Sequence, residues 1–241
     1  MSNPTAIQEL LRNNPYPGRG VLMGLMPDGG TAVLAYFIMG RSANSRNRVF
    51  VRNGEGFGIR LFREDPAADT GLTLYRPMHR AGNQLVLSNG DQTDTVAAGL
   101  AAGLSLEQAL RSRRHEPDAP HFTPRITGLM NLLDGAYTLS ILRAADNRGE
   151  ACDRLFFEYA PSPGQGRLIH TYLGDGSPLP SFEGEPRPVS IPGDLREFAR
   201  ELWASLHPDN RVALYVSGVS LQTGASEALI FNRHQEEEVH A

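Results

Sequence analysis

The feature that most constrains the fold is the unbroken apolar run Ala32–Met39. It is far shorter than the roughly 20 residues that a membrane helix needs. Its β-branched and aromatic side chains suit a buried strand better than a helix. The segment Gly20–Leu25 comes before it, across the turn sequence Pro27-Asp28-Gly29-Gly30. We therefore predict an antiparallel hairpin in the interior of the protein, with strands Gly20–Leu25 and Thr31–Met39.

A loop rich in arginine follows this buried strand, in the sequence Gly40–Arg48. The end of a rigid strand is a common place for a ligand-binding group. Guanidinium groups grip phosphates and carboxylates with two N–H bonds at once. We therefore predict that Arg19, Arg41 and Arg46 contact a small anionic ligand, and we interpret Arg48 and Arg52 as ordinary structural arginines.

The rest of the chain predicts several strands with a block of helices in the middle. Helices are expected at Thr5–Asn13, from Gln92 to about Gly103 with Asp91 as its cap, from Ser105 to about Arg114, at Arg125–Leu133, and at Pro192–Leu206. Strands are expected at Val49–Arg52, Gly56–Phe62, Leu72–Arg80, Gln84–Ser88, Ala136–Arg143, Arg154–Tyr159, Arg167–Leu173, Arg211–Val219 and Ala225–Phe231. The proline-rich linker His115–Pro124 is irregular, and His234–Ala241 is expected to be a disordered tail. We predict one α+β domain over residues 1–241, with two packed sheets and helices outside, and with residues 1–15 as a leading helix.

The amino-acid composition excludes several classes of function. All 23 cationic residues are arginine, so Schiff-base chemistry and a phosphate-loop lysine are excluded. A formal net charge of -4 argues against a general nucleic-acid binder. The single Cys152 rules out a disulfide framework and a cysteine-rich zinc site. With no membrane-length apolar run and no signal-peptide core, we expect no membrane association and a cytoplasmic location.

Five sequence blocks together resemble the archaeal-type IMP cyclohydrolases and their bacterial relatives. The blocks are Tyr16-Pro17-Gly18-Arg19, Gly40-Arg41-Ser42 with Ser45-Arg46, Leu74-Tyr75, Ser88-Asn89-Gly90-Asp91-Gln92-Thr93-Asp94-Thr95, and Thr123-Pro124-Arg125-Ile126. They follow the family's order over roughly residues 16–145. The first fifteen residues and the chain past Arg148 depart from the archaeal pattern.

The resemblance implies a four-layer αββα sandwich of the kind seen in N-terminal-nucleophile hydrolases, without the terminal nucleophile. It implies reversible closure of the formylated aminoimidazole carboxamide ribotide to IMP, with loss of water, in purine biosynthesis. The ligand is then a purine nucleotide, IMP or its open-chain precursor. Because one molecule brings both reacting groups, no metal or organic cofactor is required. Formation of a homo-oligomer is left open.

The resemblance also assigns roles to residues. Glu116 is the candidate acid/base, although a solvated turn carboxylate fits the local sequence equally well. Tyr75 is the candidate donor to the formyl oxygen or to a bound water, against a core tyrosine on a strand. Arg41 either stabilises the oxyanion or binds phosphate. The remaining predicted substrate contacts are Arg19, Ser42, Arg46, Asn89, Gly90, Asp91, Thr93, Thr123 and Arg125.

Two of these contacts carry structural alternatives. The turn Asn89-Gly90-Asp91 offers a helix N-terminus to an anion, but Asp91 and Asp94 suit helix caps better than phosphate contacts. Arg125 is expected either to bind substrate or to pair with Glu116. His115, Glu116, Asp118 and His121 match no zinc spacing, so no metal site is predicted.

Two rival functions remain at this point. One is an amide hydrolase that uses Ser2 as a terminal nucleophile after removal of Met1. The other is a purine-nucleotide-binding protein without turnover, because a fold and its binding residues do not by themselves establish catalysis.

Overall fold

The computed structural model describes residues 3–54, 56–65 and 71–240. Its helices are α1 (Ile7–Leu11), α2 (Ala43–Arg46), α3 (Gln92–Ala101), α4 (Leu106–Leu110) and α5 (Leu195–Ser205). Its strands are β1 (Arg19–Leu25), β2 (Thr31–Met39), β3 (Arg48–Asn53), β4 (Gly56–Leu61), β5 (Met78–Ala81), β6 (Gln84–Ser88), β7 (Arg125–Asn131), β8 (Tyr137–Ala144), β9 (Cys152–Tyr159), β10 (Gln165–His170), β11 (Arg187–Ser190), β12 (Arg211–Ser220), β13 (Ser226–Asn232) and β14 (Gln235–His240).

The predicted hairpin lies at the centre of the larger sheet. That sheet has the strand order β11-β10-β1-β2-β12-β13-β14, and every neighbouring pair is antiparallel. Alternate residues of β2 point to opposite faces. Leu34 and Tyr36 face a core between two sheets, while Val33 and Phe37 face a second core under helices. Because both faces of β2 are buried, its sequence is continuously apolar.

The smaller sheet has the order β5-β6-β7-β8-β9, also antiparallel throughout. It corrects the prediction of a helix at Arg125–Leu133, because Arg125–Asn131 is β7, paired with β6 and β8. Ile126 and Met130 face the core between the sheets, with Gly128 between them against Met23. A short segment buried on both faces gives no period that separates strand from helix.

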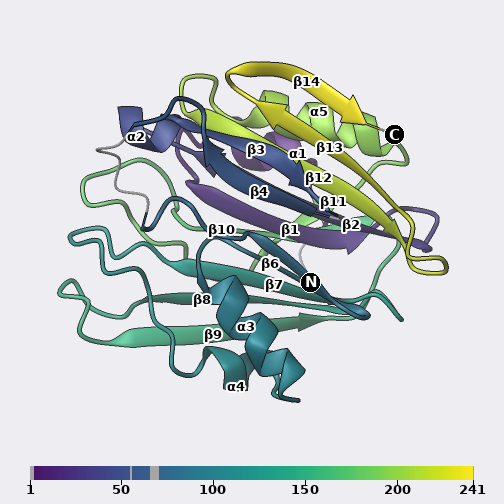
Figure 1. Cartoon of the computed structure of the whole chain (residues 1–241), viewed down its shortest axis with the longest axis horizontal. Helices are drawn as coiled ribbons and strands as arrows, with labels where there is room; N and C mark the ends of the chain where they lie inside the picture. Colours follow the sequence, from purple (N-terminus) through teal and green to yellow (C-terminus); the bar gives the residue numbers. More distant parts are fainter. Residues whose placement is uncertain (1–2, 55, 66–70, 241) are drawn as a thin grey trace.

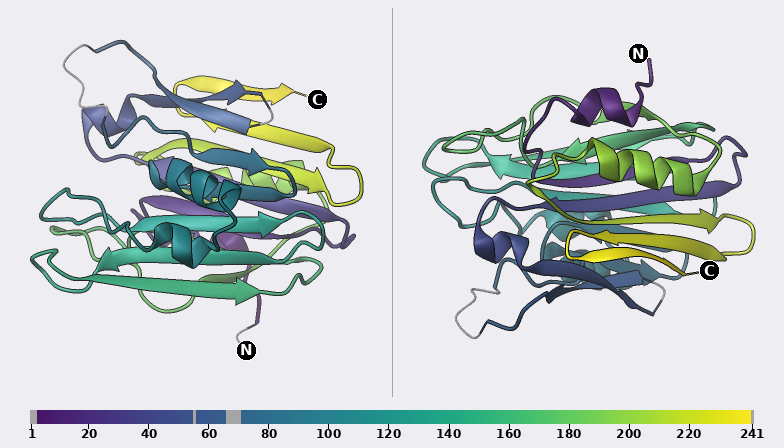
Figure 2. Two further views of the ribbon diagram at one scale, coloured as in Figure 1. Left: turned by 60° about the horizontal axis from the view of Figure 1, so that its bottom comes forward. Right: turned by 90° about the horizontal axis from the view of Figure 1, so that it is seen from above.

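The elements stack in the order helix, sheet, sheet, helix (Figure 1). The first core, between the two sheets, joins side chains such as Val21 of β1 and Leu87 of β6. Helices α1 and α5 cover the outer face of the larger sheet through a second core, visible from above in Figure 2. Helices α3 and α4 cover the smaller sheet through a third core that includes Val96 and Leu110. The predicted α+β class is confirmed; two large sheets pack together with helices outside, and β3 and β4 pair in a third, two-stranded sheet.

The structure differs from three other predictions. The strand expected at Leu72–Arg80 is only Met78–Ala81, because Pro77 removes a backbone donor that a longer ladder would need. The tail expected to be disordered contains β14, which pairs with β13 at the sheet edge, where backbone bonds form regardless of side-chain charge. Strand β11, paired with β10, was not predicted. Ala241 lies outside the described residues.

Candidate active site

The segment from His115 to Pro124 connects α4 to β7 without helix or strand, as predicted. It is held by its own hydrogen bonds: the Glu116 backbone N–H donates to the Thr123 carbonyl over 2.8 Å. The Thr123 N–H donates to Asp118 Oδ1 over 2.7 Å, and the Thr123 hydroxyl donates to Asp118 Oδ2. These bonds fold the connection inward, so that Glu116 is only 2% exposed. The alternative of a solvated turn carboxylate is therefore wrong.

Arg19 is the ionic partner of Glu116, with 3.9 Å between Nη1 and Oε2. Burial raises the pKa of the Glu116 carboxyl, and the charges of Arg19 and Arg125 oppose that rise without cancelling it. Burial lowers the pKa of Arg19, but Glu116 and nearby tyrosines more than reverse this, so Arg19 stays charged. Arg19 Nε is buried and has no hydrogen-bond partner. The pair therefore has unused capacity for a ligand.

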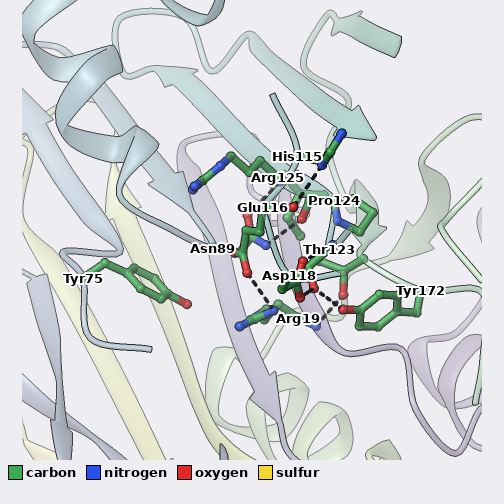
Figure 3. Close-up of polar contacts among 12 residues, drawn as sticks. Arg19, Tyr75, Asn89, His115, Glu116, Asp118, Thr123, Pro124, Arg125 and Tyr172 are labelled. Carbon is green, nitrogen blue, oxygen red and sulfur yellow. Dashed lines mark hydrogen bonds and ion pairs between the residues drawn. The ribbon is translucent and has the colours of Figure 1, made fainter. Parts of the chain in front are cut away.

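Two tyrosines, Tyr75 and Tyr36, lie near the Glu116–Arg19 ion pair. Tyr75 lies on the 72–77 connection and is partly buried, with its hydroxyl directed towards Arg19 and Glu116 (Figure 3). That hydroxyl lies 2.5 Å from the hydroxyl of Tyr36, which is fully buried on β2. Burial, and then the nearby Tyr75, raise the pKa of Tyr36 well above its usual value, so Tyr36 keeps its proton.

Either hydroxyl could be the donor in this bond, and Tyr75 is the hydrogen-bond partner of the Tyr36 hydroxyl in the part of the chain that the structure describes. A buried hydroxyl proton without an acceptor is costly, so Tyr36 donates to Tyr75. The proton of Tyr75 is then directed elsewhere, and Tyr75 can act as a donor to a ligand. Tyr75 packs against the core between the sheets, but it lies on neither a helix nor a strand, so the strand expected in the structural alternative is wrong.

A series of contacts connects Thr123 to the exposed edge of the site. Its hydroxyl lies 2.5 Å from that of Tyr172, whose ring stacks on Tyr16 at 5.9 Å. The Arg41 guanidinium lies over the Tyr16 ring, 5.0 Å from its centre. Arg41 is exposed and bonds Asp175 Oδ1 at 2.5 Å and the Gly176 carbonyl at 2.9 Å. Both of these bonds use Nη1.

The turn Asn89-Gly90-Asp91 braces the connection from behind. The Asn89 side chain donates to the Pro124 carbonyl at 2.9 Å and accepts from the Ile126 N–H at 2.8 Å. Arg125 bonds Asp91 at 2.6 Å and Gln92 Oε1 at 2.8 Å, so its polar contacts are with these residues and not with Glu116. The Asp91 side chain does not cap α3; it pairs with Arg125 and Arg113, which corrects the predicted cap.

These contacts place a carboxyl of raised pKa, a fixed guanidinium and an oriented phenol around one point. A carboxyl that is closer to neutrality can both take and return a proton. The guanidinium and the phenol can stabilise negative charge that develops on an oxygen. Together these three groups can catalyse an addition or elimination at an amide-like carbon in which a proton is transferred.

Comparison with known proteins now decides the family. The family model described as "IMP cyclohydrolase-like protein" matches residues 16–223. The chain belongs to this family. It is also 31% identical, over 172 residues, to the IMP cyclohydrolase of the archaeon Methanopyrus kandleri. That match covers 69% of this chain and 79% of the relative. The resemblance inferred from the five sequence blocks is confirmed.

Within this member of the IMP cyclohydrolase-like family, the predicted site residues fall into two groups. Glu116, Arg19, Tyr75 and Thr123 come together as described. Ser42 and Arg46 instead brace their own loop: Ser42 caps α2, and Arg46 bonds the Gly40 carbonyl at 2.9 Å and Asn210 at 3.0 Å. Thr93 is buried with its hydroxyl against Ser88 and the Gly90 carbonyl.

Sequence reasoning missed Tyr36, Tyr172 and Asp118 as members of the site. The signal for Tyr36 was a hydroxyl at the centre of an apolar strand, since a buried Tyr needs a polar partner. Tyr172 follows β10 and gave no local signal. Among the described residues, no three His, Cys, Asp or Glu side chains are arranged to hold a metal ion. In the same part of the chain, none of the helices has both the length and the apolar character to cross a membrane.

Proposed function

We propose that this protein is an IMP cyclohydrolase that closes the formylated aminoimidazole carboxamide ribotide to IMP, reversibly and with release of water. The observation that carries the proposal is the buried Glu116, with its raised pKa, paired with Arg19, towards which the hydroxyl of Tyr75 is directed. Membership of the family and the name of the archaeal relative point to the same reaction.

The reaction first joins the carboxamide nitrogen to the formyl carbon. This nitrogen is a poor nucleophile, so a base must take one of its protons during the attack. Glu116, as the carboxylate, takes that proton and passes it to the oxyanion formed from the formyl oxygen, which becomes a hydroxyl. The former formamide nitrogen then gives up its own proton to the departing hydroxyl, which leaves as water. The water therefore carries one proton from each nitrogen, and the ring is closed.

The formyl oxygen gains negative charge in the first step. Tyr75, held as a donor by Tyr36, provides a hydrogen bond to this oxygen. Arg19 lies beside both Glu116 and the tyrosines, and its charge opposes build-up of negative charge at either place. Thr123 and Asp118 hold the connection that carries Glu116, and Arg41 stands at the exposed edge of the site.

The proposal also includes the fold type, the ligand, the cellular location and the oligomeric state. The order helix, sheet, sheet, helix supports the αββα sandwich of N-terminal-nucleophile hydrolases, used without a terminal nucleophile. The rival nucleophile Ser2 lies outside the described residues. A purine nucleotide as ligand, a single domain over residues 1–241, a cytoplasmic location and formation of a homo-oligomer stay predictions.

The test is a spectrophotometric assay of the purified protein with the formylated ribotide in metal-chelating buffer. We expect IMP to form at a rate that chelation does not change, because the proposed steps use only side chains. A matched protein with an N-terminal extension should be equally active, whereas a mechanism through Ser2 would lose its free amine. No turnover, with IMP still raising the unfolding temperature, would replace the enzyme by a binding protein.

A further inference from the structure

Arg48, at the first position of β3, is the largest fully buried side chain of the described residues and is 1% exposed. Its Nε donates to the Ser45 carbonyl at 2.8 Å, and its Nη2 makes a long contact of 3.4 Å with the Met39 carbonyl. Its Nη1 has no hydrogen-bond partner. Within the described part of the chain, no carboxylate forms an ion pair with it. A buried cation without a counter-charge is an expensive arrangement.

The position of Arg48 brings this charge to the candidate active site. Arg48 and Phe50 lie on the same side of β3, because residues two apart share a face. The Phe50 ring stacks on Tyr36 at 5.7 Å. The carbonyl that Arg48 contacts belongs to Met39, whose N–H donates to the Gly18 carbonyl, next to Arg19. Arg48 therefore lies beside β2, which carries Tyr36, and near the start of β1, which carries Arg19.

The electrostatic neighbours of Arg48 agree with this placement. Burial lowers its pKa first, followed by the positive charge of Arg19, while Tyr75, Tyr36 and Tyr16 act in the opposite direction. Arg19 is compensated by Glu116, whereas Arg48 adds a second positive charge to the same group of tyrosines. Among the residues that the structure describes, no opposite charge is paired with Arg48.

We infer that Arg48 is an electrostatic positioning residue of the cyclohydrolase: its uncompensated charge, next to the Tyr36–Tyr75 hydroxyl pair, stabilises the negative charge that develops on the substrate oxygen at Tyr75. The inference rests on the proposed function. Arg48 does not touch the substrate, since Nη1 is buried, but a charge acts over several ångströms in a medium that excludes water. Such a charge is unfavourable in the ground state and favourable in the transition state, which is the condition for raising kcat.

The test compares the Arg48→Met, Arg48→Lys and Arg52→Met variants with the wild type. Met keeps an unbranched apolar side chain of similar reach. Arg52 is a matched control, since it lies on the same strand and also donates to a backbone carbonyl, that of Ala228. The readouts are kcat, the Kd for IMP, and the unfolding temperature of the ligand-free protein.

For Arg48→Met we expect kcat to fall at least about tenfold, with the Kd for IMP changed by less than about threefold. The ligand-free variant should unfold at the wild-type temperature or above it, because an uncompensated buried charge has been removed. Arg48→Lys should recover part of the lost kcat, and Arg52→Met should keep the wild-type value.

The inference is overturned if Arg48→Met keeps the wild-type kcat. It is also overturned if this variant fails to fold or unfolds well below the wild type, because Arg48 would then be a structural brace for the Ser45 and Met39 carbonyls. An inactive wild type would instead reject the proposed function itself, so the two failures are distinguishable.

Discussion

At the scale of single residues, the site depends on which way one proton points. Tyr36 and Tyr75 share one hydrogen bond of 2.5 Å, and the full burial of Tyr36 decides which of the two donates. Tyr36 thereby acts through Tyr75, and Tyr75 acts on the substrate. The two side chains form one unit, so their contributions to catalysis should not add.

Replacing each tyrosine by phenylalanine tests this unit. Tyr75→Phe removes the donor to the formyl oxygen and should lower kcat about a hundredfold. Tyr36→Phe leaves that donor in place but unoriented, and a fall of about tenfold is expected. The double variant should be no slower than Tyr75→Phe, as measured by kcat with the formylated ribotide. Additive losses would mean that the two hydroxyls act independently.

Sequence reasoning found part of this residue-scale picture. Glu116, Tyr75 and Thr123 came from the family resemblance, and Arg19 came from the arginine pattern as well. The structure brings these residues together. Local sequence gave no warning that Ser42 caps α2 or that Arg46 bonds the Gly40 carbonyl and Asn210, because a loop arginine looks the same with or without a partner. Arg48 was interpreted as an ordinary arginine, since its burial arises only when β3 and β4 fold over the strand ends.

At the scale of elements, hairpins were predictable and β7 was not. The bounds Thr31–Met39 and Gln84–Ser88 agree with the strands observed, because turn residues mark their ends. Segment 125–131 has a glycine and mixed side chains, and only its pairing with two neighbouring strands makes it a strand. Its burial on both faces depends on α3, α4 and the larger sheet, none of which the local pattern reveals.

One glycine links an element to the site. Gly18, just before β1, has φ of +78°, and a Cβ there would lie 2.2 Å from Thr171 Oγ1 and 2.5 Å from Tyr172 Cδ2. Gly18→Ala should cost about 1 kcal/mol in backbone strain and about 1–3 kcal/mol in overpacking. Urea unfolding measures the sum. It should also lower activity, because Tyr172 contacts Thr123.

Gly54→Ala is the control for that variant. Gly54 has φ of +58°, but no atom of the described residues beyond its chain neighbours lies within 4 Å of the position that its Cβ would take. It should therefore lose only the backbone part, about 1 kcal/mol, and keep full activity. Equal losses of stability in the two variants would show that packing against Thr171 and Tyr172 contributes nothing.

At the scale of the whole molecule, the site lies where the two sheets meet. Arg19 and Tyr36 come from the larger sheet, while Glu116 and Tyr75 come from connections that lead into the smaller one. Composition and pattern predicted two sheets with outer helices, because each element must bury one face. Pattern did not predict which strand ends meet, since that depends on how the sheets pack on each other. The family resemblance provided that information indirectly.

The central claim is that Glu116 moves the proton in ring closure. The most direct test measures kcat/KM for the formylated ribotide against pH in the wild type and in Glu116→Gln. Because burial raises the pKa of Glu116, the wild-type rate should rise with pH through a midpoint above that of an ordinary glutamate. Glu116→Gln should be slower by at least about a hundredfold and should lack this acid limb. A Glu116→Gln variant with the wild-type rate and the same pH profile would contradict the account.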